Sequence, residues 1–174
     1  IDSSPYVSDA ASYQNVLDSI NSNDHTQFIQ LVTMQNHAPY NDFYADNQFK
    51  EADVSQLSDE EKQSIDNYAK GISLTDQETA DFLNQLNAVD KPVTVIFYGD
   101  HLPALGIETD ELATGDLYQT TYVLWNNFGL DMEGGDLQAF QLSAYVLGQL
   151  NIHTGILTRF HQNFAPDCDE DDYL

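Results

Sequence analysis

The stretch that most constrains the fold is an uninterrupted apolar run near the middle of the chain, residues 93–98. Six apolar or β-branched residues in succession are typical of a strand that is buried on both faces, as in a parallel sheet. The run ends at Gly99, and Asp100 and His101 follow at once. In open α/β sheets, ligands bind beyond the carboxyl ends of the strands. We therefore expect these two side chains at the edge where a ligand would bind.

A carboxylate beside an imidazole at such a position can hold a divalent metal ion. The same dipeptide is also compatible with an aspartate that caps a turn next to a partly buried histidine. A lone Asp-His pair does not separate these two interpretations. From the residues alone, both interpretations of Asp100 and His101 stay open.

A second strand candidate, residues 28–34, is followed by Asn36 and His37. Strands of one parallel sheet deliver their ends to one edge, so we expect His37 to lie near His101. Two roles fit His37 equally well at this point. It is either a loop imidazole that is hydrogen-bonded to backbone, or a group that donates a hydrogen bond to a substrate.

The rest of the chain alternates helical and extended patterns. Ser8 or Asp9 is predicted to cap the first helix, Gly71 to end the second, and Thr75 to open the third as part of a capping box. The predicted strands are 28–34, 93–98 and 117–125, and the predicted helices are 10–20, 59–70, 75–89, 136–150 and 152–164. This order predicts an α/β fold, a three-layer sandwich with a mainly parallel sheet and helices on both faces.

The charge of the chain is strongly negative, with 29 acidic and five basic residues and a formal net charge of −24. Such a surface repels nucleic acid, so no nucleic-acid partner is expected. The single Cys168 excludes an internal disulfide. The chain begins at Ile1 and has no apolar run near the ~20 residues that cross a bilayer, so we expect a soluble piece of a longer protein. The acidic tail, residues 166–174, is predicted to be disordered.

Two motifs carry a resemblance to a known family. The stretches Val-Thr-Met-Gln-Asn-His-Ala-Pro-Tyr (32–40) and Phe-Tyr-Gly-Asp-His-Leu-Pro (97–103) resemble the lipoteichoic acid synthase and phosphoglycerol transferase family. That family belongs to the sulfatase and alkaline phosphatase superfamily. The spacing of the motifs fits, and the resemblance extends from about Ser8 to Leu150. It implies that residues 1–165 form the C-terminal portion of a sulfatase-like catalytic domain.

The resemblance also implies a function. Members of that family transfer phosphoglycerol from a phosphatidylglycerol-type lipid head group to a growing polymer, such as a glycerol-phosphate chain. They work on the extracellular face of the cell membrane, anchored by transmembrane helices upstream of the catalytic domain. A threonine nucleophile and one divalent ion, Mn²⁺ or Mg²⁺, carry the reaction. By resemblance, Asp100 and His101 are metal ligands, and His37 with Asn36 binds the phosphoglycerol group.

The chain departs from the family pattern in one large respect. The Gly-Gly-x-Thr-like stretch of the nucleophile and the glutamate ligand before it do not occur here, since Gly134-Gly135 is followed by Asp136. We therefore expect this chain alone to be inactive. Two other functions stay open: a sulfatase or phosphodiesterase of the same superfamily, because fold does not fix substrate, and a non-catalytic acidic binding module.

Overall fold

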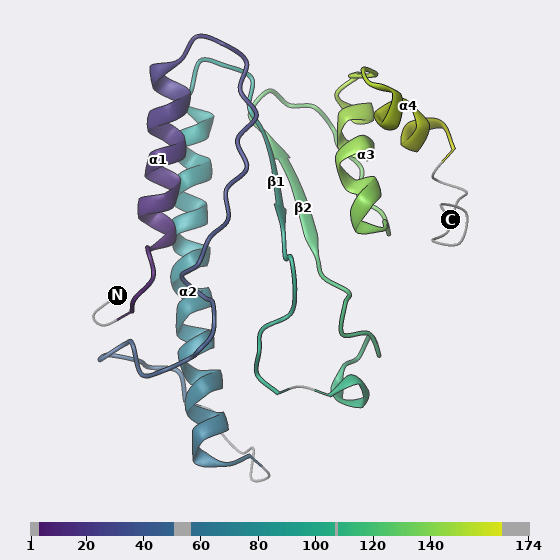
Figure 1. The fold of residues 1–174 in the computed structure, drawn as a ribbon. Coiled ribbons are helices and arrows are strands. Elements are labelled where there is room, and N and C mark those ends of the chain that lie inside the picture. Colours follow the sequence, from purple (N-terminus) through teal and green to yellow (C-terminus); the bar gives the residue numbers. More distant parts are fainter. Residues whose placement is uncertain (1–3, 51–56, 107, 165–174) are drawn as a thin grey trace.

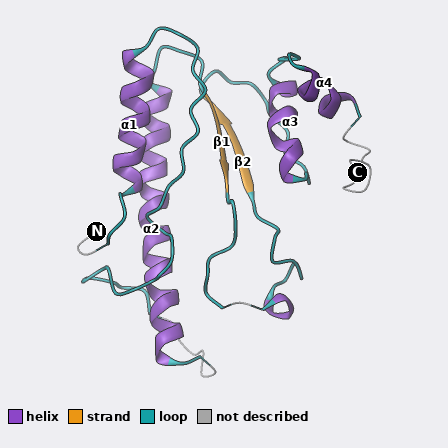
Figure 2. Ribbon diagram, viewed as in Figure 1, coloured by secondary structure: helices purple, strands orange, loops and turns teal. Residues whose placement is uncertain are grey.

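The computed structural model describes residues 4–50, 57–106 and 108–164. Two long helices lie side by side on one side of a strand pair, and two short helices lie on its other side (Figure 1, Figure 2). The elements are α1 (Asp9–Ser22), α2 (Asp59–Asn87), β1 (Thr94–Tyr98), β2 (Tyr122–Asn126), α3 (Leu142–Gln149) and α4 (Ile156–Asn163). The predicted α/β class is confirmed.

Both long helices begin where the sequence predicts, each after a serine cap. Ser8 caps α1, and its hydroxyl accepts a hydrogen bond from Ala11 N at 3.2 Å. Ser58 caps α2 through a complete capping box, in which Ser58 Oγ accepts from Glu61 N and Glu61 Oε2 accepts from Ser58 N at 2.7 Å. These bonds satisfy backbone donors that have no partner within the helix.

The predicted break at Gly71 is wrong, because α2 continues without interruption to Asn87. Gly71 is buried where another segment approaches closely: a Cβ added there would lie 2.2 Å from Asn36 Oδ1. The glycine therefore makes room for a contact instead of ending the helix. Thr75, the predicted cap of a third helix, lies inside α2 for a related reason, since its hydroxyl bonds to side chains of other segments.

The core lies between the long helices and one face of the strands. Tyr13 of α1 stacks on Phe82 of α2 with ring centroids 4.5 Å apart, and Leu86 is completely buried. The other members are Leu17 and the partly buried Val16, Ile20, Leu83, Val89, Val93, Val95, Phe97 and Trp125. Apolar burial on this scale is the main favourable term in folding, and it fixes β1 against the helices.

The strand pair differs from the predicted sheet. β1 and β2 are antiparallel, with Thr94 opposite Asn126 and Tyr98 opposite Tyr122, where a mainly parallel sheet was expected. The chain reverses direction between them, through the described residues 99–106 and 108–121, and antiparallel pairing needs no crossover helix. β1 is also only half-buried, because a single face packs on the core. β2 begins at Tyr122, later than predicted.

The predicted strand 28–34 does not form. This segment runs back from the end of α1 toward its beginning (Figure 1), and Phe28 is 91 % exposed. A strand requires a hydrogen-bonded neighbour, and the described part of the chain supplies none to these residues. The apolar residues of this segment therefore predicted an extended backbone correctly, but the prediction that it pairs in a sheet was wrong.

The side chain of Asn127, just after β2, joins the end of α2 to the start of β1. Its Oδ1 accepts from Val93 N at 2.8 Å, and its Nδ2 donates to Leu86 O at 3.0 Å and to Lys91 O at 2.9 Å. One amide thus ties a carbonyl of the last turn of α2 and a carbonyl of the following segment to the first residue before β1.

The C-terminal helices are shorter than predicted. A 3₁₀ turn at Ala139–Gln141 leads into α3, so the predicted helix 136–150 does not begin at Asp136. A second 3₁₀ turn, Thr109–Glu111, lies in the loop between the strands. Within the described ranges, no helix combines the length and apolarity needed to span a bilayer. The predicted acidic tail, 166–174, lies outside the described residues.

Candidate metal and phosphate site

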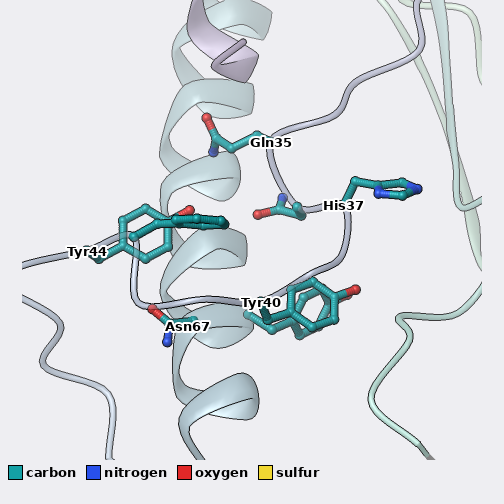
Figure 3. Close-up of a pocket in the computed structure, with 8 residues that line it drawn as sticks. Gln35, His37, Tyr40, Tyr44 and Asn67 are labelled. Carbon is teal, nitrogen blue, oxygen red and sulfur yellow. The ribbon is translucent and has the colours of Figure 1, made fainter. Parts of the chain in front are cut away.

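His37 stands in a tight turn that follows the extended segment. Its backbone N donates to Met34 O at 3.0 Å, and its ring Nδ1 lies 2.7 Å from Ala38 O. A carbonyl oxygen only accepts, so Nδ1 carries the hydrogen and Nε2 remains as the outward-facing nitrogen. The ring points away from α2 (Figure 3). The contact of Nδ1 with backbone fits the predicted role of a loop imidazole. The exposed Nε2 fits the predicted role of a hydrogen-bond donor to substrate.

Asp100 and His101 follow β1 directly, as the sequence predicts. Asp100 Oδ1 lies 3.7 Å from His101 Nε2, and the two side chains are 70 % and 61 % exposed. The His101 ring repeats the arrangement of His37, with Nδ1 at 2.7 Å from the following carbonyl, Leu102 O. Metal-binding histidines usually donate their second ring N–H to such an acceptor, which fixes the tautomer and orients the ring.

The structure brings the two histidines together. The ring centroids of His37 and His101 are 6.2 Å apart and nearly perpendicular, and the Tyr6 ring lies 5.9 Å from that of His37. A second bridge joins the same loops, since Tyr40 Oη accepts from Ala104 N at 3.3 Å. Burial raises the pKa of Tyr40, so its phenol stays protonated near neutral pH. The expected meeting of the two segments is therefore observed, although neither lies in a parallel sheet.

The donor set fits one side of a divalent cation site. A separation of 3.7 Å between Asp100 Oδ1 and His101 Nε2 is less than twice a metal–ligand bond of about 2.1 Å, so one ion can reach both atoms. A carboxylate and an imidazole suit Mn²⁺ or Mg²⁺ better than a thiolate metal. Within the part of the chain that the structure describes, no group of three or more such side chains is gathered for a metal. These residues would thus supply part of a coordination shell.

A small cavity separates His37 from α2. It holds about 10 Å³, roughly the space of one water molecule, and is lined by Gln35, Asn36, His37, Tyr40, Phe43, Tyr44, Asn67 and Tyr68 (Figure 3). Asn67 is 4 % exposed, and its Oδ1 has no hydrogen-bond partner among the described residues. The cavity is too small for a phosphoglycerol group, which leaves the exposed side of His37 and His101 as the place for a ligand.

Asn36 does not face the histidines. Its Nδ2 donates to Thr75 Oγ1 at 2.7 Å, and its Oδ1 lies against the place where a Gly71 side chain would be. The amide is therefore directed at α2 and anchors the turn that carries His37, and substrate binding by Asn36 stays a prediction.

Sequence reasoning missed two residues behind this turn, Asp9 and Thr75, which were interpreted as helix caps. Thr75 donates to Asp9 Oδ2 at 2.6 Å, and Asp9 is 1 % exposed. Burial raises the pKa of the Asp9 carboxyl, and the Thr75 hydrogen bond offsets part of that rise. The available signal was the spacing of Gly71 and Thr75, because residues four apart share one face of a helix.

The fold and these residues define a class: an α/β chain with a histidine and an Asp-His pair held beside each other on neighbouring loops. Residues 1–157 match the Sulfatase family, and the chain belongs to that family. The predicted resemblance to the sulfatase and alkaline phosphatase superfamily is thereby confirmed. Members of the Sulfatase family are metal-dependent. No curated protein matches the chain significantly.

One solved structure is similar along almost the entire chain. It is the Streptococcus pyogenes phosphoglycerol transferase GacH in complex with sn-glycerol-1-phosphate, which is 25 % identical and superposes with a TM-score of 0.72. The match covers 98 % of this chain and 44 % of GacH. The chain thus spans less than half the length of that protein.

Proposed function

We propose that this chain is part of a metal-dependent phosphoglycerol transferase that acts on phosphatidylglycerol-type lipid head groups at the extracellular face of the membrane. The observation that carries the proposal is the 6.2 Å approach of the His37 and His101 rings beside Asp100. The likeness to GacH, whose structure holds sn-glycerol-1-phosphate, supports the substrate class.

Each residue then has a distinct task. Asp100 and His101 would hold a divalent ion, Mn²⁺ or Mg²⁺, through Oδ1 and Nε2, together with ligands that this chain lacks. When bound, such an ion neutralises charge on phosphoryl oxygens. His37, in its protonated form, would donate from Nε2 to a phosphate oxygen or a glycerol hydroxyl. Asn36 would act on substrate through the backbone position of His37.

Because the chain is strongly negative, the proposed binding of phosphoglycerol requires a metal ion. An anionic phosphate is repelled by a chain with a formal charge of −24, which has only five lysines and arginines to attract it. A divalent ion at Asp100 and His101 reverses the local sign next to His37. Phosphoglycerol binding should therefore depend on the metal.

The experiment is a nuclear magnetic resonance titration of the 174-residue chain with Mn²⁺ in excess Mg²⁺, which occupies unspecific acidic sites. Mn²⁺ is paramagnetic and should selectively broaden the imidazole signals of His101 and His37. Asp100→Ala should remove this selective broadening. The matched control is Asp24→Ala, because Asp24-His25 is a second Asp-His pair on the exposed surface of the same chain.

In a separate sample with Mg²⁺ as the only metal, adding sn-glycerol-1-phosphate should shift the His37 signal, and without metal it should not. Equal broadening of all five histidines, or the same response in Asp100→Ala and wild type, would contradict the proposal. The prediction that the isolated chain is inactive is checked separately: steady release of glycerol phosphate from phosphatidylglycerol by the pure chain would refute it.

A second candidate is sulfate ester hydrolysis by the parent protein, favoured by the match to the Sulfatase family. The same metal pair would serve either reaction, since both polarise an oxyanion. Assaying the parent with an aryl sulfate and with phosphatidylglycerol separates the two. Turnover of the sulfate alone would support the second candidate and exclude the first.

A further inference from the structure

The hydroxyl of Thr75 uses its complete hydrogen-bonding capacity. It donates to Asp9 Oδ2 at 2.6 Å and accepts from Asn36 Nδ2 at 2.7 Å and Gln35 Nε2 at 3.3 Å. A threonine hydroxyl has one donor and two acceptor positions, and all three are occupied here. A residue in the middle of α2 thus holds both side chains that precede His37.

Asp9 closes this network from the start of α1. Its backbone N donates to Gln35 Oε1 at 3.0 Å, so Gln35 bridges Asp9 and Thr75, which are themselves bonded. Asp9 is 1 % exposed, and its acid lies in the first turn of α1, where the helix dipole favours negative charge. Three segments, residues 9, 35–36 and 75, are joined in one closed ring of hydrogen bonds.

The turn itself transmits this anchoring to the imidazole. Met34 O accepts from His37 N at 3.0 Å, so residues 35 and 36 are the two inner positions of the turn. With both inner side chains fixed on Thr75, the turn has little freedom to rotate. The His37 ring leaves this turn on the side opposite α2 and meets His101 at 6.2 Å.

We propose that Thr75 and Asp9 are positioning residues that hold the His37 imidazole against His101 for phosphate recognition. The inference rests on the function proposed above, because it takes His37 as the group that meets the phosphoglycerol. Neither residue touches the ligand side of the site. Their effect passes through Gln35 and Asn36.

The chain contains a matched control for this test. Thr79 lies one helical turn beyond Thr75 in α2, and its hydroxyl is 3.0 Å from Tyr13 Oη of α1. Thr79→Val therefore removes a hydrogen bond between the same two helices with the same change in shape as Thr75→Val. The difference is that the Thr79 hydroxyl bonds to Tyr13, whereas the Thr75 hydroxyl bonds to Gln35 and Asn36 in the turn before His37. Thr75→Ser retains the hydroxyl and serves as the conservative variant.

The first readout is the imidazole ¹H–¹³C spectrum of the ligand-free chain. The second is the affinity for sn-glycerol-1-phosphate, measured with diamagnetic Mg²⁺ in place of Mn²⁺. Thr75→Val should shift or broaden the His37 signal, weaken its cross-relaxation to His101, and lower phosphate affinity about tenfold. Thr79→Val should leave all three as in wild type, and Thr75→Ser should restore them.

An unchanged His37 signal in folded Thr75→Val would overturn the proposal, as would an equal change in Thr79→Val. If Thr75→Val does not fold, Asn36→Ala decides, because it removes one arm of the network and leaves the Asp9–Thr75 bond intact. The ligand-free spectra separate this inference from the proposed function. A wild type that ignores sn-glycerol-1-phosphate contradicts the function, while the His37 changes alone decide the positioning.

Discussion

Replacing Gly71 by alanine tests the contact between α2 and the turn that carries His37. A Cβ at this position would lie 2.2 Å from Asn36 Oδ1, 3.3 Å from Asn36 Cγ and 3.1 Å from Tyr44 Oη. Carbon and oxygen do not approach so closely without a bond, so one group must move. Asn36 cannot turn away freely, because its Nδ2 is bonded to Thr75 at 2.7 Å.

Two opposing free-energy contributions decide whether Gly71→Ala raises or lowers the free energy of unfolding. Alanine in the middle of a helix is favoured over glycine by about 1 kcal/mol. Against this, displacing Asn36 breaks a hydrogen bond worth about 1 kcal/mol, and forcing extra volume into a packed site costs about 1–3 kcal/mol. We expect Gly71→Ala to lower the free energy of unfolding by about 1–3 kcal/mol, which is about 2–4 °C in Tm per kcal/mol for a chain of this size.

The assay is urea unfolding followed by circular dichroism, with Gly148→Ala as control. Gly148 lies in α3, and a Cβ there would be no closer than 3.5 Å to Gln162, an ordinary contact. That substitution should be neutral or stabilising. In an Asn36→Ala background, Gly71→Ala should lose most of its cost, because the closer clashing oxygen is gone and only the 3.1 Å contact with Tyr44 Oη remains. If Gly71→Ala were as stable as Gly148→Ala, the proposed close packing would be refuted.

Two further substitutions test the ends of the helices. Ser58→Ala should destabilise the chain by about 1 kcal/mol through loss of the α2 capping box, whereas Ser64→Ala inside α2 should have little effect; equal effects in thermal unfolding would contradict the cap. Asp9→Asn should gain stability relative to wild type as pH rises. Burial raises the pKa of Asp9 above 3.8, so the contribution of Asp9 to stability is greatest below pH 3.8 and is lost as the pH rises through the folded-state pKa. A difference between Asp9→Asn and wild type that does not vary with pH in denaturant titrations would exclude this linkage.

The local elements of the fold could largely be predicted from the sequence. Ser8 and Ser58 cap the two long helices because their hydroxyls bond to backbone donors within the same turn, and such short-range chemistry is visible in the residues alone. The strand after Lys91 was also predictable, since six apolar residues in a row have few other uses. The meeting of His37 and His101 followed from placing both at the ends of extended segments.

The predictions that were wrong concern residues whose contacts lie far away in the sequence. Gly71 and Thr75 resemble a helix end and a helix start, yet both are inside α2 because of Asn36 and Asp9, which are 35 and 66 positions away. The antiparallel pairing of β1 and the absence of pairing for residues 28–34 depend likewise on which strands are neighbours in space. Periodicity identifies extended backbone but contains no information about its partner.

The bonds of Asn127 have a mechanical consequence at the opposite end of β1. They hold the α2 terminus and the start of β1 at a fixed angle, and β1 then extends about 20 Å to Gly99 at roughly 3.3 Å per residue. Asn127 is therefore one of the contacts, with the apolar core, that set the direction of β1. A tilt of about 5° at this end of β1 would move Asp100 and His101 by nearly 2 Å, a displacement that matters greatly where roughly 1 Å affects reactivity. The placement of Asp100 and His101, the proposed metal ligands, thus depends in part on a residue at the other end of β1.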